Sequence, residues 1–175
     1  QVPDDDDLVV VCAKGQSSEF VAGKLNEEAD YDATNLGDGM NGWARVYEHT
    51  DVELDAVTVR QYRRPSSGCL AYMAYADEEA VVVDPLRAFV DRYVEDADAL
   101  GVEITPVLDT HVHADHISGA RELADATGAR LLLPEDAVAR GIEYDADYET
   151  VADGDAITVG DSTVEAIATP GHTSG

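Results

Sequence analysis

The chain has 175 residues, of which 45% are hydrophobic, and its 37 acidic against 11 basic residues give a formal net charge of −26. This charge excludes a general nucleic-acid binder, because phosphate binding needs a basic surface, and no apolar run is long enough to cross a bilayer. We expect a soluble, cytoplasmic protein whose acidic surface suits a halophilic source, since strong salt screens the self-repulsion of such a surface.

The first fifty residues predict a partial domain with a parallel α/β pattern. A short Val-rich run indicates a buried strand, a Gly-containing turn follows it, and helical spacing then leads to a second strand and a Gly-rich segment before a short helix. In chain order these segments are residues 8–12, 13–18, 19–28, 33–36, 37–43 and 43–47. Strand, loop, helix and strand in this order is typical of a parallel sheet.

Residues 51–175 predict a second domain with a mixed α/β pattern. The strands expected from apolar runs and alternation are residues 52–62, 69–76, 80–84, 104–110, 130–133, 156–159 and 163–169. The helices expected from their spacing are residues 89–100, 117–127 and a short one over 134–140. Glycines directly after the first two helices fit the residue that ends a helix in the left-handed conformation.

Four of the five histidines lie in two loops, each of which follows a predicted strand. His111, His113 and His116 share the first loop with Asp115, and His172 lies in the second. Imidazole and carboxylate groups are the usual ligands of zinc and iron. A polar turn with chance histidines is the alternative, but this density of ligand types between a buried strand and a helix favours a metal-binding loop.

The pattern His-x-His-x-Asp-His after a strand resembles the signature of the metallo-β-lactamase superfamily. Residues 81–85, Val-Val-Val-Asp-Pro, resemble an earlier motif of that family, a strand that ends in an aspartate near the metals. Residues 169–173, Thr-Pro-Gly-His-Thr, resemble its later histidine motif. The resemblance covers about residues 53–175 and implies an αββα sandwich, two mixed sheets with helices outside and metals at one edge.

This resemblance also implies which residues bind metal in the members with two metals. One metal would be held by His111, His113 and His172, and a second by Asp115 and His116. The bridging aspartate and the last histidine of the family come later in sequence. We therefore expect the metallo-β-lactamase-fold domain to be truncated at its C-terminus and its metal site to be incomplete.

Residues 110–120, Thr-His-Val-His-Ala-Asp-His-Ile-Ser-Gly-Ala, are most similar to the persulfide dioxygenase group, whose members use one iron. This similarity implies one Fe(II) held by His111, His172 and a later aspartate, with His113, Asp115 and His116 orienting ligands or shaping the pocket. The implied reaction oxidises a low-molecular-weight thiol persulfide with O₂ to sulfite and free thiol.

The alternative within the superfamily is a hydrolase of thioesters that resembles glyoxalase II. Such an enzyme would bind Zn(II), one ion or two, to generate hydroxide and to polarise a carbonyl group. It would use as ligands His111, His113, Asp115, His116 and His172. The loop is compatible with both enzymes, and Asp115 is a candidate catalytic residue as well as a ligand.

Cys12 lies at the end of the first predicted strand and before a helix. Backbone N–H groups in such a loop can cradle an anion and stabilise a thiolate. The loop resembles the active loop of rhodanese sulfurtransferases, and residues 36–43 resemble the rhodanese Gly-Gly-x-x-x-Trp segment, so residues 1–50 resemble the C-terminal half of such a domain. The resemblance implies that Cys12 carries a persulfide, but Ala13 and Ser17 stand where many active rhodaneses have arginines, so a small buried cysteine is the alternative.

A sulfur-carrying unit in the same chain as a thiol-handling metalloenzyme makes sense for persulfide chemistry and favours the dioxygenase over the hydrolase. This argument rests only on which two domains occur together. We expect a small-molecule thiol or persulfide substrate, no nucleic acid and no membrane as partners, and we leave a homodimer open. The non-enzymatic alternative is a binding module that kept the fold and lost its activity.

Overall fold

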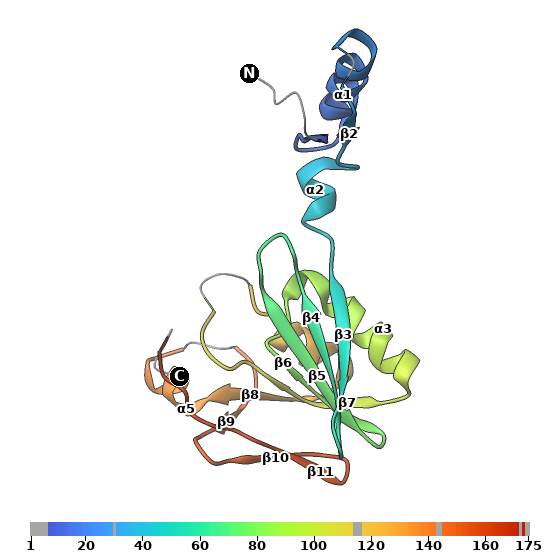
Figure 1. Ribbon diagram of the computed structural model, residues 1–175. Coiled ribbons are helices and arrows are strands. Elements are labelled where there is room, and N and C mark those ends of the chain that lie inside the picture. The colour runs from blue at the N-terminus through green and yellow to red at the C-terminus, as the bar shows by residue number, and fades with distance from the viewer. Residues whose placement is uncertain (1–6, 30, 114–116, 143–144, 172, 174–175) are drawn as a thin grey trace. The chain divides into compact units, whose positions relative to one another are not determined.

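The computed structural model describes residues 7–29, 31–113, 117–142, 145–171 and 173 (Figure 1). The chain divides into two compact units. Among the described residues, no helix is both long and apolar enough to span a membrane.

The first unit, Gln1–Glu48 with Arg64–Gly68, contains a small parallel sheet. Its elements in chain order are β1 (Leu8–Val10), α1 (Gln16–Ala29), β2 (Ala33–Asn35) and α2 (Gly39–Trp43). β1 pairs with β2 in parallel, and α1 connects the two strands. The structure thus confirms the strand, helix and strand predicted for this part of the chain.

The position predicted for the short helix over residues 43–47 is wrong, because α2 ends at Trp43. The Gly-rich segment itself forms the helix. The first turn of this helix is held against the preceding loop, because the Met40 N–H donates a hydrogen bond of 2.9 Å to the carbonyl of Cys12. Gly39 has a φ of +58°, and a Cβ on this residue would collide with the Cys12 carbonyl oxygen. Glycine therefore allows α2 to begin directly against the Cys12 loop.

The second unit, His49–Arg63 with Cys69–Gly175, is built on a seven-stranded mixed sheet in the order β3-β4-β5-β6-β7-β8-β9. These strands are β3 (Glu48–Glu53), β4 (Thr58–Arg63), β5 (Leu70–Ala76), β6 (Glu79–Val83), β7 (Glu103–Leu108), β8 (Arg130–Pro134) and β9 (Glu149–Val151). β5 pairs in antiparallel fashion with both β4 and β6, whereas β6 pairs in parallel with β7, β7 with β8 and β8 with β9. The sheet is therefore mixed, as predicted.

The remaining elements of this unit lie on the faces and edges of the sheet. They are the 3₁₀ helix Arg87–Phe89, α3 (Val90–Leu100), α4 (Ala120–Thr127), α5 (Glu135–Ala139), β10 (Ala156–Val159) and β11 (Ser162–Glu165). β10 and β11 form an antiparallel hairpin. α3 and α4 both contact β7 and contact each other, and α4 also contacts β8.

The two faces of the sheet are covered by different elements. Val81, Leu108 and Leu132 share a core cluster with Ile157 and Val159 of the β10–β11 hairpin. Because side chains alternate between faces along a strand, the neighbours of these residues in β6, β7 and β8 point to the opposite face, which α3 and α4 cover. Hairpin, sheet and helices thus form successive layers.

Several predicted boundaries differ from the structure for local reasons. The strand predicted over 52–62 is two strands, because the chain turns after β3, where the Leu54 N–H donates to the Val57 carbonyl at 3.0 Å. The strand predicted over 163–169 ends at Glu165. β9 was not predicted, since three mainly polar residues give little periodic signal.

The helix predicted from residue 117 begins later, at Ala120. Ser118 forms a β-bridge with Leu86, and the Gly119 N–H donates a hydrogen bond of 2.7 Å to the carbonyl of Pro85. These contacts hold the residues just before α4 in a non-helical path.

Candidate metal centre

Two neighbouring strands of the large sheet end at the candidate site. Asp84 directly follows β6, and the histidine-rich loop follows β7 and leads into α4. The two strands are parallel, and Val83 pairs with Leu108 at their ends. The residues that follow therefore emerge side by side at one edge of the sheet, the usual place for a site in an α/β protein.

The Asp84 carboxylate is the centre of a hydrogen-bond network. Its Oδ1 accepts the Thr110 backbone N–H at 2.6 Å and lies 2.9 Å from His113 Nε2, and its Oδ2 accepts the Thr110 hydroxyl at 2.7 Å. Asp84 has a φ of 53°, a left-handed conformation that costs a non-glycine residue about 1–3 kcal/mol. The network stabilises this backbone conformation, which turns the carboxylate toward the loop.

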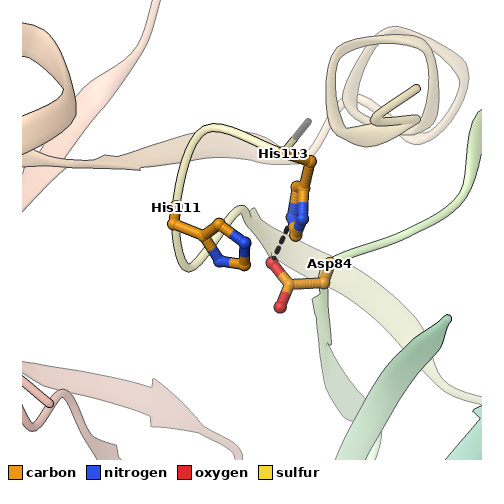
Figure 2. Close-up of side chains that lie close together, drawn as sticks. All are labelled: Asp84, His111 and His113. Carbon is orange, nitrogen blue, oxygen red and sulfur yellow. Dashed lines mark hydrogen bonds and ion pairs between the residues drawn. The ribbon is translucent and has the colours of Figure 1, made fainter. Parts of the chain in front are cut away.

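His111 and His113 lie together beside Asp84, as Figure 2 shows. Their ring centroids are 4.1 Å apart, and Thr110 Oγ1 lies 2.9 Å from His111 Nδ1. One ligand-type atom from each of His111, His113 and Asp84 falls within 4.8 Å of the others. Two imidazoles, each with one ring nitrogen held by a hydroxyl or a carboxylate, fit a zinc or iron site, because such partners orient the rings of metal-binding histidines.

The two carboxylates next to His113 have opposite pKa shifts. Burial disfavours the charged form of Asp84, but hydrogen bonds from His113 and Thr110 outweigh it and hold the pKa of Asp84 below its ordinary value. Burial raises the pKa of Asp109 to about 6, against the opposing effects of a hydrogen bond from Ser118 and of the nearby His113. Asp84 is therefore ionised at neutral pH and suited to accept an N–H from the His113 ring.

A cavity of about 120 Å³ lies beside the two histidines. Asp109, His111 and His113 supply polar groups to its lining, and Leu133 and Ala137 supply part of an apolar wall. A few converging polar groups against an apolar wall are typical of a small-molecule binding site.

The other predicted metal ligands, Asp115, His116 and His172, lie outside the described residues. The structure adds two residues to the network, Thr110 and Asp109, that the sequence pattern does not mark as candidates. A sequence signal for Asp109 existed, because a charged residue inside the buried strand predicted over residues 104–110 is unusual.

Cys12 lies in the loop between β1 and α1 of the first unit. Its Sγ accepts the Gly15 backbone N–H at 3.1 Å and lies 3.2 Å from the Ser18 hydroxyl, whose single proton it shares with the Gly15 carbonyl oxygen, 2.9 Å from Ser18 Oγ. The hydrogen bond from the Ser18 hydroxyl is the largest cause that lowers the pKa of Cys12 to about 6, with help from neighbouring backbone groups. The thiol is therefore largely ionised at neutral pH, and the thiolate is the nucleophilic form of cysteine.

Two kinds of curated relatives match this chain. It is 35% identical over 135 residues to the mitochondrial persulfide dioxygenase ETHE1 of Bos taurus, a match that covers 75% of this chain and 50% of that protein. It is 36% identical over 85 residues to the hydroxyacylglutathione hydrolase of Erythrobacter litoralis, covering 48% of this chain and 32% of that protein. The chain thus spans half or less of the length of these relatives.

Solved structures with the same fold match about two thirds of this chain. A metallo-beta-lactamase from Staphylococcus aureus matches with a TM-score of 0.61 and 28% identity, covering 70% of this chain and 37% of that one. ETHE1 from Myxococcus xanthus matches with a TM-score of 0.58 and 32% identity, covering 66% of this chain and 50% of that one. Residues 65–175, well over half of the chain, match the metallo-beta-lactamase superfamily. This match agrees with the mixed sheet and with the paired histidines at its edge, and the chain belongs to the metallo-β-lactamase superfamily.

Proposed function

We propose that this chain is part of a persulfide dioxygenase, an enzyme that oxidises a low-molecular-weight thiol persulfide with O₂. One persulfide, one O₂ and one water give one thiol, one sulfite and two protons. The observation that carries the proposal is the extent of similarity to persulfide dioxygenase ETHE1, 135 residues at 35% identity, against 109 residues at 34% identity for the hydroxyacylglutathione hydrolase of Rhodopseudomonas palustris strain BisB5.

The proposed iron ligands are His111, His172 and an aspartate later in the sequence. A facial site of two histidines and one carboxylate is typical of non-haem Fe(II) oxygenases, in which the iron supplies open positions for O₂ and substrate. Thr110 Oγ1 lies against His111 Nδ1, which supports Nε2 of His111 as its ligand atom. The role proposed for His113, whose Nε2 is held by Asp84, is to shape the pocket beside the iron.

The rival is a glyoxalase II-like hydrolase of thioesters with two zinc ions. Its mechanism would use metal-bound hydroxide and a polarised carbonyl, and it would also take His113, Asp115 and His116 as ligands. The proximity of His111 and His113, with ring centroids 4.1 Å apart, is compatible with this site as well. The two proposals therefore differ in metal content and in the need for O₂.

The deciding experiment measures metal content and both activities in the full-length protein. We expect one iron per chain, O₂ uptake with a low-molecular-weight persulfide, sulfite as a product, and loss of uptake in His111→Ala. Two zinc ions per chain, with hydrolysis of a glutathione thioester and no O₂ uptake, would reject the dioxygenase. Equal O₂ uptake by the wild type and His111→Ala would reject the metal site itself.

We propose in addition that Cys12 is a sulfurtransferase residue that accepts sulfane sulfur. Two donors, the Gly15 N–H and the Ser18 hydroxyl, point at its Sγ and favour the thiolate. A thiolate can attack the outer sulfur of thiosulfate or of a persulfide, form a new S–S bond and release sulfite or a thiol, respectively, as the leaving group.

Mass spectrometry of the protein after exposure to thiosulfate tests this second role. We expect an added sulfur atom on wild-type protein, none on Cys12→Ser, and removal of the sulfur by a thiol. Cys69→Ser is the matched control, because Cys69 is a buried free cysteine that lies in the other unit of the chain. A sulfur atom retained equally in Cys12→Ser would reject the role.

A further inference from the structure

The metal-binding loop is closed at its base by two side chains. Asp109 is the first residue after β7, and Ser118 precedes α4 by two residues. The Ser118 hydroxyl lies 2.9 Å and 2.7 Å from the two carboxylate oxygens of Asp109 and donates to this carboxylate. His111 and His113 both lie between these two residues in sequence, so the pair joins the start and the end of the loop that carries them.

Each end of this loop is also tied to a neighbouring strand or turn. The Asp109 N–H donates to the Leu132 carbonyl of β8 at 3.3 Å. Ser118 forms a β-bridge with Leu86, and its hydroxyl accepts the Ala120 N–H at 3.0 Å. The base of the loop is therefore a fixed frame made by β7, β8 and the start of α4.

Burial of an acidic residue at this place needs an explanation. Asp109 is only 6% exposed, and it lies near a second carboxylate, that of Asp84, which raises the free energy of a second negative charge. A neutral side chain could close the loop at lower cost, because a buried charge without full compensation is unfavourable. Asp109 Oδ1, however, is 3.9 Å from Nε2 of His113, so the carboxylate also faces the histidine that Asp84 holds.

We propose that Asp109 and Ser118 form a positioning pair for the metal-binding loop. The inference rests on the proposed metal site and goes beyond it, since neither residue is proposed as a ligand. Ser118 fixes the carboxylate of Asp109, and that carboxylate lies 3.9 Å from Nε2 of His113, the same ring nitrogen that Asp84 holds at 2.9 Å. The pair thereby sets the separation of the loop ends and the orientation of the His113 ring before metal binds.

This role predicts a specific energetic effect. A loop that is already ordered loses its conformational entropy when the protein folds, so metal binding is not weakened by that loss. A loop with an open base becomes ordered only when the metal binds, and the entropy then lost lowers the affinity for the metal. Replacement of a residue that orients a metal ligand through a hydrogen bond typically lowers metal affinity about 10- to 100-fold. We expect an effect in this range from removal of the Ser118 hydroxyl.

The experiment compares single variants of the full-length protein loaded with Co²⁺, whose visible absorption reports ligand geometry. We expect Ser118→Ala to weaken Co²⁺ binding about 10- to 100-fold and to shift the absorption bands. We expect Ser118→Thr, which keeps the hydroxyl, to have the Co²⁺ affinity and the absorption bands of the wild type. Thr127→Ala is the matched control, because its hydroxyl lies at the other end of α4, where it donates to the Leu123 carbonyl and accepts the Ala129 N–H. It should lower the melting temperature without changing Co²⁺ affinity or the spectrum.

The outcomes separate this inference from the proposed metal site. If His111→Ala binds Co²⁺ as tightly as the wild type, the metal site fails. If His111→Ala loses binding but Ser118→Ala keeps wild-type affinity and spectrum, the metal site stands and the positioning role fails. A Ser118→Ala protein that only melts earlier, as Thr127→Ala does, also rejects the positioning role, because a helix cap alone explains it.

Discussion

Replacement of Asp84 by asparagine tests the hydrogen-bond network most directly. A carboxylate only accepts hydrogen bonds, so the Thr110 hydroxyl must donate to Asp84 Oδ2, 2.7 Å away. The same hydroxyl oxygen lies 2.9 Å from His111 Nδ1 and is then an acceptor for that ring nitrogen. Asp84 therefore favours the tautomer of His111 in which Nδ1 carries the proton and Nε2 has the lone pair that a metal needs.

In Asp84→Asn, an amide nitrogen in the place of Oδ2 reverses the direction of these two hydrogen bonds. The amide donates to the Thr110 hydroxyl, the hydroxyl donates to His111 Nδ1, and the proton moves to Nε2 of His111, where it competes with the metal. The opposite amide orientation places a donor against the Thr110 N–H and His113 Nε2, two groups that Asp84 Oδ1 faces in the native protein. We expect metal affinity to fall about 10- to 100-fold, which corresponds to about 1.4–2.8 kcal/mol.

The assay is a chelator competition titration with Zn²⁺ or Co²⁺ on the full-length protein. Thr110→Val, which removes the hydroxyl but keeps the shape of the side chain, should cause a loss of similar size, and the two losses should not add in the double variant. Asp155→Asn is the control, since its carboxylate accepts the Ala152 N–H at an exposed turn. Wild-type metal affinity in both Asp84→Asn and Thr110→Val would refute the tautomer argument.

Three further predictions concern other parts of the molecule. The rate of Cys12 alkylation by iodoacetamide should rise with pH around a midpoint near 6, because the folded protein lowers the pKa of this thiol to about 6. Ser18→Ala should move this midpoint to higher pH. An unchanged midpoint in Ser18→Ala would contradict the role of the hydroxyl. Gly119→Ala should lower the free energy of unfolding by about 1–3 kcal/mol in a urea titration, since an added Cβ would lie 2.8 Å from the Arg87 Cα; a stability equal to the wild type would show that the turn adapts. With a formal net charge of −26, the melting temperature should rise from low to molar KCl as salt screens the self-repulsion, and a constant melting temperature would reject the proposal of a halophilic source.

The order and type of most elements could be predicted because their apolar residues have clear periods. The parallel pairing of β1 and β2 follows from the strand, helix and strand pattern at the start of the chain. The turn between β3 and β4 was missed, because residues 52–62 read as one continuous alternation. The start of α4 was placed too early, since the β-bridge that Ser118 makes is a contact with the distant Leu86 and leaves no local signal.

The sequence by itself determined the superfamily, because the histidine ligand pattern is contiguous in the chain and chemically specific. It also pointed to Asp84 through the strand that precedes it. Only the tertiary structure decided what Asp84 does: the parallel pairing of β6 with β7 brings its carboxylate to Thr110 and His113. Likewise, the contact between Asp109 and Ser118 depends on the loop folding back on itself. Such contacts are set by strand register and loop path, which no local pattern of residues encodes.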